Sequence, residues 1–217
     1  MNIPASCKVA IFDMDGLMID SEPYWAKADQ AFFEKYNKPY KSEINQRIMR
    51  MGQREIMEFY KKEFGFVGET QILIRERKNL LYEFLFVGIT LMDGVKEIIR
   101  ALYQEEFILA VATSGHTVEK AQSILNKVGL QNYFSLVVSG DDVEKSKPAP
   151  DIYLKTAELL FVQPSVCLVF EDAPNGVRAG KAAGMSVFGV NKDPDLYQKL
   201  QVAGADSVFR SFKEILI

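Results

Sequence analysis

Four short apolar runs, each followed by polar residues, set the strongest constraint on how this chain can fold. The first run, residues 8–12, leads into Asp13 and Asp15, and Gly16 comes directly after them. Alternate side chains of a strand share one face, so both aspartates would project together from the strand's carboxyl end, where Gly16 lets the backbone turn away. In open α/β sheets, ligands bind at this end of the strands.

The other three apolar runs are followed by hydroxyl groups, a lysine and a second pair of acids. They are residues 107–112 before Thr113 and Ser114, residues 136–139 some way before Lys147, and residues 166–170 before Glu171 and Asp172. Carboxylates that meet at a buried strand end repel one another, so a compensating group is needed. A hard cation with oxygen ligands, Mg²⁺ above all, is the expected answer.

Each feature taken alone also has an ordinary structural explanation. An Asp-x-Asp-Gly sequence is common in turns and calcium loops. Ser114 could cap the helix expected near residue 116, and Lys147 could be a solvated loop lysine. Glu171 and Asp172 could merely complement a helix N-terminus. Four such features at consecutive strand ends favour one shared site instead.

Together these motifs resemble those of the haloacid dehalogenase (HAD) superfamily, and the resemblance covers nearly the whole chain. Asp13-Met-Asp15-Gly16 is similar to its first motif, Thr113 to its second, Lys147 to its third and Glu171-Asp172 to its fourth. Residues 13–22 and 147–151 resemble the subgroup with a helical cap inserted just after the first motif. That subgroup includes β-phosphoglucomutases, sugar-phosphate phosphatases and pseudouridine 5′-phosphatases.

The rest of the chain indicates an α/β fold. From residue 94 onward, helical and strand patterns alternate, which predicts a doubly wound parallel sheet, the Rossmann-like HAD core. We expect this catalytic core to comprise residues 1–17 and 89–217. Residues 18–88 have helical periodicity and no convincing strand, which predicts a small α-helical cap domain and a candidate lid. Residues 211–214 have the pattern of a capping box that opens a short helix.

Composition limits the partners and the compartment. A net charge of −3 and a pI near 5.4 leave no basic face for nucleic acid. Nothing resembles a signal peptide or a membrane span, and two cysteines are too few for a disulfide framework. We therefore expect a cytoplasmic protein. We also expect a monomer, and the resemblance implies that its partner is a small phosphorylated metabolite.

The resemblance implies a phosphomonoester hydrolase that works through an aspartyl-phosphate. Asp13 would attack phosphorus, and Asp15 would act as general acid and then as general base. Mg²⁺ would be held by Asp13, the Asp15 carbonyl and Asp172, with Glu171 as a further candidate ligand. Thr113, Ser114 and Lys147 would bind the phosphoryl group. We expect Asp15 to be protonated when substrate arrives, because the site already holds four or five negative charges.

Three alternatives remain at this point. A phosphomutase would return the phosphoryl group to a sugar, but β-phosphoglucomutases carry a histidine twelve residues after the nucleophile, where this chain has Trp25. A dehalogenase would have little use for Asp15. A receiver-like phospho-aspartate switch has its acidic pair early and its phosphorylated aspartate in mid-chain, the reverse of the order here. The candidate substrate contacts in the cap are Trp25, Gly52, Gln53 and Arg54.

Overall fold

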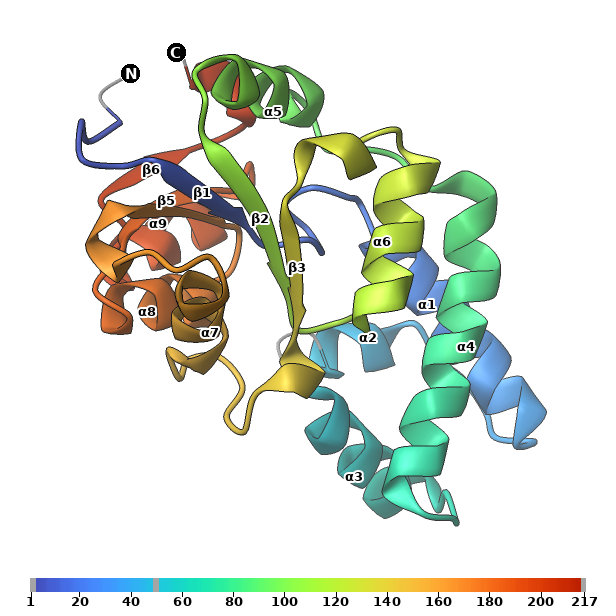
Figure 1. Cartoon of the computed structure of the whole chain (residues 1–217). Coiled ribbons are helices and arrows are strands. Elements are labelled where there is room, and N and C mark those ends of the chain that lie inside the picture. The colour runs from blue at the N-terminus through green and yellow to red at the C-terminus, as the bar shows by residue number, and fades with distance from the viewer. Residues whose placement is uncertain (1–2, 49–50, 216–217) are drawn as a thin grey trace. The chain divides into compact units, whose positions relative to one another are not determined.

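The computed structural model describes residues 3–48 and 51–215. The chain divides into two compact units, which are described separately (Figure 1). The α/β unit consists of Met1–Asp20 and Thr90–Ile217, and the helical unit is Ser21–Ile89. In the described residues, no helix is both long and apolar enough to cross a membrane.

The α/β unit is built on a six-stranded sheet with the order β3-β2-β1-β4-β5-β6. All the strand pairs are parallel. The strands are β1 (Val9–Phe12), β2 (Ile108–Thr113), β3 (Leu136–Ser139), β4 (Cys167–Glu171), β5 (Ser186–Val190) and β6 (Ser207–Phe209). Strands β2 and β3 lie on one side of β1, and β4, β5 and β6 lie on the other. The predicted doubly wound parallel sheet is therefore confirmed. The order also reverses next to β1, and such switch points are where α/β sheets bind ligands.

Helices cover both faces of the sheet (Figure 1). One face carries α7 (Asp151–Leu159), α8 (Pro174–Ala182) and α9 (Pro194–Val202), and the other carries α5 (Val95–Gln104) and α6 (Val118–Lys127). The central strands are therefore buried on both sides, which explains why they read as continuous apolar runs rather than as alternating patterns. Short 3₁₀ turns lie at Gln131–Tyr133, Gly140–Asp142, Pro164–Val166 and Phe212–Glu214.

Alternation along β1 supplies apolar side chains to both of these layers. Val9 and Ile11 pack with residues of α7, α8 and α9. Phe12 points to the other face, where its ring stacks on Phe170 at a centroid distance of 4.8 Å. Both rings also contact Phe212, which is buried. With β1 packed on both sides, the residue that follows it has a fixed position at the edge of the sheet.

The helical unit contains α1 (Glu22–Lys35), α2 (Glu43–Ile48), α3 (Gln53–Phe64) and α4 (Thr70–Gly88). Its core is largely aromatic, with Phe32 stacked on Phe66 at 5.1 Å and Phe33 edge-on to Tyr60 at 4.9 Å. Gly65 ends α3 in the left-handed conformation, with φ of 66°, which glycine adopts without a steric penalty.

Two expectations about helix starts are not found in the structure: the alternative role of Ser114 as a cap, and the capping box at residues 211–214. The cap of α6 is Thr117, whose hydroxyl accepts a hydrogen bond from the Lys120 amide, and not Ser114. Phe212–Glu214 form a 3₁₀ turn, and Ser211, which precedes it, makes no side-chain cap. The carboxylate of Glu214 instead accepts from the amide of Arg210, one residue earlier than a capping box requires.

Candidate active site

Three carboxylates meet where β1 and β4 end. Asp13 follows β1 directly and extends its pairing, because its amide donates to the Phe170 carbonyl at 3.1 Å. Glu171 is the last residue of β4, and Asp172 comes next. One carboxylate oxygen from each of these acids lies within 4.8 Å of those of the other two. Parallel neighbouring strands thus place acids that are about 160 positions apart in the sequence side by side.

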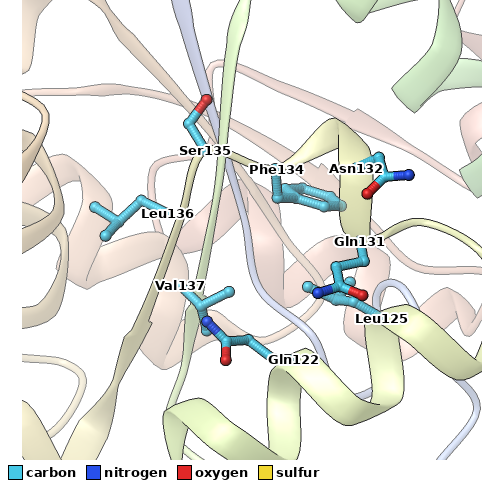
Figure 2. Close-up of a pocket in the computed structure, with 8 residues that line it drawn as sticks. All are labelled: Gln122, Leu125, Gln131, Asn132, Phe134, Ser135, Leu136 and Val137. Atoms are coloured by element: carbon cyan, nitrogen blue, oxygen red, sulfur yellow. The ribbon is translucent and has the colours of Figure 1, made fainter.

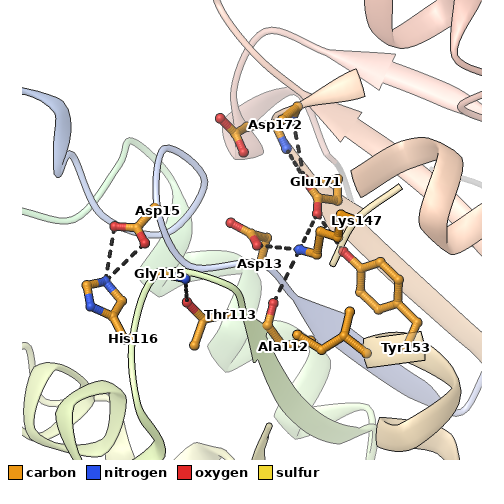
Figure 3. Close-up of polar contacts among 12 residues, drawn as sticks. Asp13, Asp15, Ala112, Thr113, Gly115, His116, Lys147, Tyr153, Glu171 and Asp172 are labelled. Carbon is orange, nitrogen blue, oxygen red and sulfur yellow. Dashed lines mark hydrogen bonds and ion pairs between the residues drawn. The ribbon is translucent and has the colours of Figure 1, made fainter. Parts of the chain in front are cut away.

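Lys147 joins two of these acids (Figure 3). Its ammonium group donates to Asp13 Oδ1 and to Glu171 Oε1, each at 2.6 Å. The hydroxyl of Tyr153 donates to the same Glu171 oxygen at 2.5 Å. The other Glu171 oxygen accepts from the amides of residues 172 and 173, at 3.2 and 3.3 Å. Both oxygens of Glu171 are therefore engaged with protein donors, so this residue is arranged to hold Lys147.

Glycines make room for these carboxylates. A Cβ added to Gly16 would clash with the carboxylate of Asp172, and one added to Gly176 would clash with that of Glu171. Gly16 also has φ of 80°, a conformation that side chains rarely adopt. A glycine is thus required at position 16 by the backbone conformation and also by the close approach of Asp172.

Burial and mutual repulsion disfavour ionisation in this cluster. Burial raises the pKa of Asp13 from 3.8 to about 7, with Lys147 opposing the rise and Glu171 adding to it. Burial and the charge of Glu171 also raise the pKa of Asp172 well above its ordinary value. For Lys147, burial lowers the pKa, but the charges of Asp13 and Glu171 outweigh burial and raise it.

Charge and donor chemistry together fit a divalent cation. Three carboxylates face a single ammonium group, which leaves two formal negative charges without compensation. All the ligand atoms on offer are carboxylate oxygens, which Mg²⁺ prefers to nitrogen or sulfur. A cation of charge +2 would balance the cluster and favour the ionised forms of Asp13 and Asp172.

The second aspartate of the first motif lies apart from that cluster. Asp15 turns toward His116, whose Nε2 is 3.0 Å from Oδ2 and 3.1 Å from Oδ1 (Figure 3). Thr113 ends β2 as a buried residue, and its hydroxyl accepts from the Gly115 amide at 3.3 Å. Ser114 is exposed in the same loop. Thr113, Ser114 and His116 thus lie at the end of β2 and in the loop that leads to α6, at the carboxyl end of the sheet.

Sequence reasoning missed four contributors to the site. Tyr153 and His116 contact predicted residues, the Ala112 carbonyl accepts from Lys147 at 3.4 Å, and the Asn191 side chain donates to the Asp172 carbonyl at 3.1 Å. None of them belongs to a motif with a characteristic spacing. His116 had one available signal, because it is the only histidine in the chain.

The candidate cap residues all lie in the helical unit. Trp25 is half-buried in α1, Gly52 and Gln53 begin α3, and Arg54 is exposed. Gln53 is tied to α4, because its Oε1 accepts from Arg77 at 2.8 Å. The Arg77 guanidinium also lies 4.4 Å from the centre of the Trp25 ring. Arg77 therefore contacts two of the four predicted residues.

A separate pocket of about 280 Å³ lies between α6, the 3₁₀ turn after it and β3 (Figure 2). Its lining includes Leu136 and Val137, at the start of β3, and the side-chain amides of Gln122 and Gln131. The carboxylate cluster follows the opposite ends of the strands, so this pocket is not part of the candidate site.

Comparison with known proteins agrees with this geometry. The family of haloacid dehalogenase-like hydrolases matches residues 10–190. A phosphorylated carbohydrates phosphatase of Thermotoga maritima is 33% identical, over 96% of this chain and 100% of its own length. A β-phosphoglucomutase of Bacillus subtilis is 29% identical, over 97% of this chain and 92% of its own.

A solved structure has the same fold. CbbY from Rhodobacter sphaeroides, in complex with phosphate, matches with a TM-score of 0.83 over 96% of each chain, at 23% identity. At that identity the likeness concerns the fold alone. The family match covers most of the chain, including all four of the motifs that supply the site. The chain belongs to the haloacid dehalogenase-like hydrolase family.

Proposed function

We propose that this protein is a Mg²⁺-dependent phosphatase that hydrolyses a small phosphorylated metabolite, a sugar, polyol or nucleoside monophosphate. The observation that carries the proposal is the cluster of Asp13, Glu171 and Asp172 around Lys147 at the carboxyl ends of β1 and β4. The match to a phosphorylated carbohydrates phosphatase over nearly the whole of both chains supports the substrate class.

Each residue has a role that its surroundings support. Asp13 is the nucleophile, and it forms an aspartyl-phosphate that water then hydrolyses. Its carboxylate is held by Lys147, whose charge also offsets the repulsion between Asp13 and a phosphate dianion. Glu171 and Tyr153 hold Lys147 in place. Thr113 and Ser114, with the amides of their loop, bind the phosphoryl oxygens.

Asp13, Asp172 and the Asp15 carbonyl would hold Mg²⁺, which supplies positive charge to the phosphoryl group and to the nucleophile when bound. Asp15 donates a proton to the leaving alcohol in the first half-reaction and takes one from water in the second. The Asp15 carboxyl group is not one of the three acids that could hold an ion together, which supports this division of roles.

We also propose that the helical unit is the cap that selects the substrate. Its place in the chain supports this role, because it is inserted directly after the segment that carries Asp13 and Asp15. We propose Gln53, at the start of α3, and Trp25, in α1, as substrate contacts. Arg77 holds both side chains in place, by a hydrogen bond to Gln53 and by its position over the Trp25 ring. Arg54, which is exposed, remains a candidate phosphate or hydroxyl contact.

A phosphomutase is the second candidate function, favoured by the 29% identity to a β-phosphoglucomutase. It would use the same aspartyl-phosphate and differ only in the group that accepts the phosphoryl. The absence from this sequence of a histidine at position 25 favours hydrolysis.

A release assay for inorganic phosphate over a panel of sugar, polyol and nucleoside monophosphates tests the proposal. We expect turnover of at least one substrate class with Mg²⁺ and none in excess chelator. Substrate labelled with ³²P should leave label on the denatured wild-type protein and none on Asp13→Asn. Full activity in chelator, or equal labelling of Asp13→Asn, would contradict the mechanism.

A further inference from the structure

The only histidine in the chain contacts the carboxyl group of Asp15 and is otherwise enclosed by protein. His116 is completely buried, and its Nε2 atom lies 3.0 and 3.1 Å from the two oxygens of Asp15 (Figure 3). The side chain of Asp15 is 25% exposed. One edge of the carboxyl group thus faces a fixed imidazole, while part of its surface stays open to solvent.

The loop that carries His116 is held from both neighbouring strands. The hydroxyl of Ser139, at the end of β3, donates to the His116 carbonyl at 2.7 Å. Thr113, at the end of β2, accepts from the Gly115 amide, and Thr117 caps α6 on the other side. The imidazole therefore sits on a backbone with hydrogen bonds before, at and after its own position, and its own orientation is restricted by burial.

Gly115 provides the space that this contact needs. A Cβ at position 115 would clash with Oδ2 of Asp15. The backbone conformation at position 115 does not itself require a glycine, because its φ is not in the positive range. Its role is to let the carboxyl group of Asp15 reach the loop, so residues 115 and 116 together define where that group lies.

We propose that His116 is a positioning residue that holds Asp15 for its acid–base work. This inference rests on the proposed function of Asp15. An aspartate side chain has several rotamers, and proton transfer needs one of them to be held near the reacting oxygen. With its proton on Nε2, the imidazole can donate to an ionised carboxylate, and it can also donate to the carbonyl oxygen of a protonated carboxyl group. The contact can therefore persist on both sides of the proton transfer.

A double-mutant cycle on phenyl phosphate and p-nitrophenyl phosphate tests this role. These probes differ little in shape, but phenolate is the more basic leaving group and depends more on a general acid. The ratio kcat/KM reports the first chemical step when that step limits it. We expect His116→Leu to lower kcat/KM about 10–100-fold for phenyl phosphate and less than about 3-fold for p-nitrophenyl phosphate. In an Asp15→Asn background, His116→Leu should have no further effect.

Two more variants keep the test decisive if His116→Leu does not fold. His116→Gln retains an amide donor near the position of Nε2 and should recover most of the activity on phenyl phosphate. Gly115→Ala leaves the histidine in place but displaces Asp15, and it should reproduce the selective loss. Thermal unfolding of each variant tests whether the fold is intact.

The outcomes separate this inference from the proposed function. Equal losses on both probes, or a loss that adds to that of Asp15→Asn, would overturn the role of His116 while leaving the phosphatase intact. Wild-type activity in Asp15→Asn itself would instead overturn the acid–base role of Asp15 on which the inference rests.

Discussion

Each unit of this protein buries a charged cluster, and the two clusters differ in balance. In the helical unit, Asp29 and Arg77 form a two-pronged ion pair with distances of 2.5 and 2.8 Å, and both side chains are at most 2% exposed. One negative charge meets one positive charge, and Gln53 takes a further donor of Arg77. In the α/β unit, three carboxylates meet a single ammonium group.

The difference distinguishes a cluster whose charges stabilise the fold from a cluster whose excess charge is suited to binding. Burial of charge is costly, and a balanced pair with well-directed hydrogen bonds offsets most of that cost. For Arg77, burial lowers the pKa, but the hydrogen bond and charge of Asp29 outweigh it. An excess of negative charge has no such compensation within the protein. Burial raises the pKa values of Asp13 and Asp172, and the charge of Glu171 adds to the rise while Lys147 opposes it. A site left in that state is suited to bind a cation and a reactant.

The largest expected effect comes from Asp13→Asn. The amide keeps the shape of the side chain but removes the proposed nucleophile, so phosphatase activity should fall on the order of 10⁴-fold or more. The melting temperature should stay the same or rise, because the substitution removes one of the excess negative charges. Phosphate release and thermal unfolding measure the two effects. A variant that keeps a tenth of the activity would show that the covalent route is wrong.

The same chemical change in the balanced cluster should act on stability. Asp29→Asn leaves Arg77 buried without its counter-charge, which should cost about 3–5 kcal/mol. Hydrogen exchange at the amides of α1 and α4 localises the loss to the helical unit, in a way that global unfolding cannot. The matched control is Asp29→Leu combined with Arg77→Met, which removes both charges and should recover much of the stability. A cost below about 1 kcal/mol for Asp29→Asn would remove the contrast between the clusters.

The excess charge also predicts a pH dependence. The pKa of Asp13 rises from 3.8 in the unfolded chain to about 7 in the fold, so between these values the folded state binds more protons than the unfolded state. Its contribution to stability is complete below pH 4 and is lost as the pH rises toward 7. We expect a loss of at most about 4 kcal/mol, since about three pKa units at about 1.4 kcal/mol each set the upper limit and the acids of the cluster titrate together.

Denaturant unfolding from pH 4 to 8 in chelator, with Asp13→Asn as the reference, isolates this contribution from the surface groups. Saturating Mg²⁺ should flatten the difference between the two proteins, because a bound cation stabilises the charged carboxylates. Parallel curves for wild type and Asp13→Asn in chelator would mean that Asp13 does not titrate in this range.

The two clusters also differ in how far sequence could predict them. Asp13, Glu171 and Asp172 each end an apolar strand run, and parallel strands bring such ends to one edge whatever the sequence distance. Asp29 and Arg77 are 48 positions apart on two helices, and helical periodicity does not tell which faces will meet. Tyr153 and His116 were missed for a similar reason, since each is placed by packing around the sheet. The sequence could not decide which residue caps α6, because Ser114 and Thr117 both precede the helix and only the backbone decides between them.

The smallest expected effect concerns Trp25, which we propose distinguishes this protein from the mutases. Its ring lies under Arg77, so it belongs to the balanced cluster of the helical unit. Trp25→His supplies the residue that mutases have, but it adds no means of holding a bisphosphate intermediate. We expect no interconversion of β-glucose 1-phosphate and glucose 6-phosphate by either protein, and only a modest loss of stability from the lost ring contact, about 0.5–2 kcal/mol. A coupled assay for glucose 6-phosphate, run beside phosphate release, measures both fates of the aspartyl-phosphate. Formation of glucose 6-phosphate by the wild type faster than phosphate release would make the protein a mutase, with Asp13, Asp15 and Lys147 in the same roles.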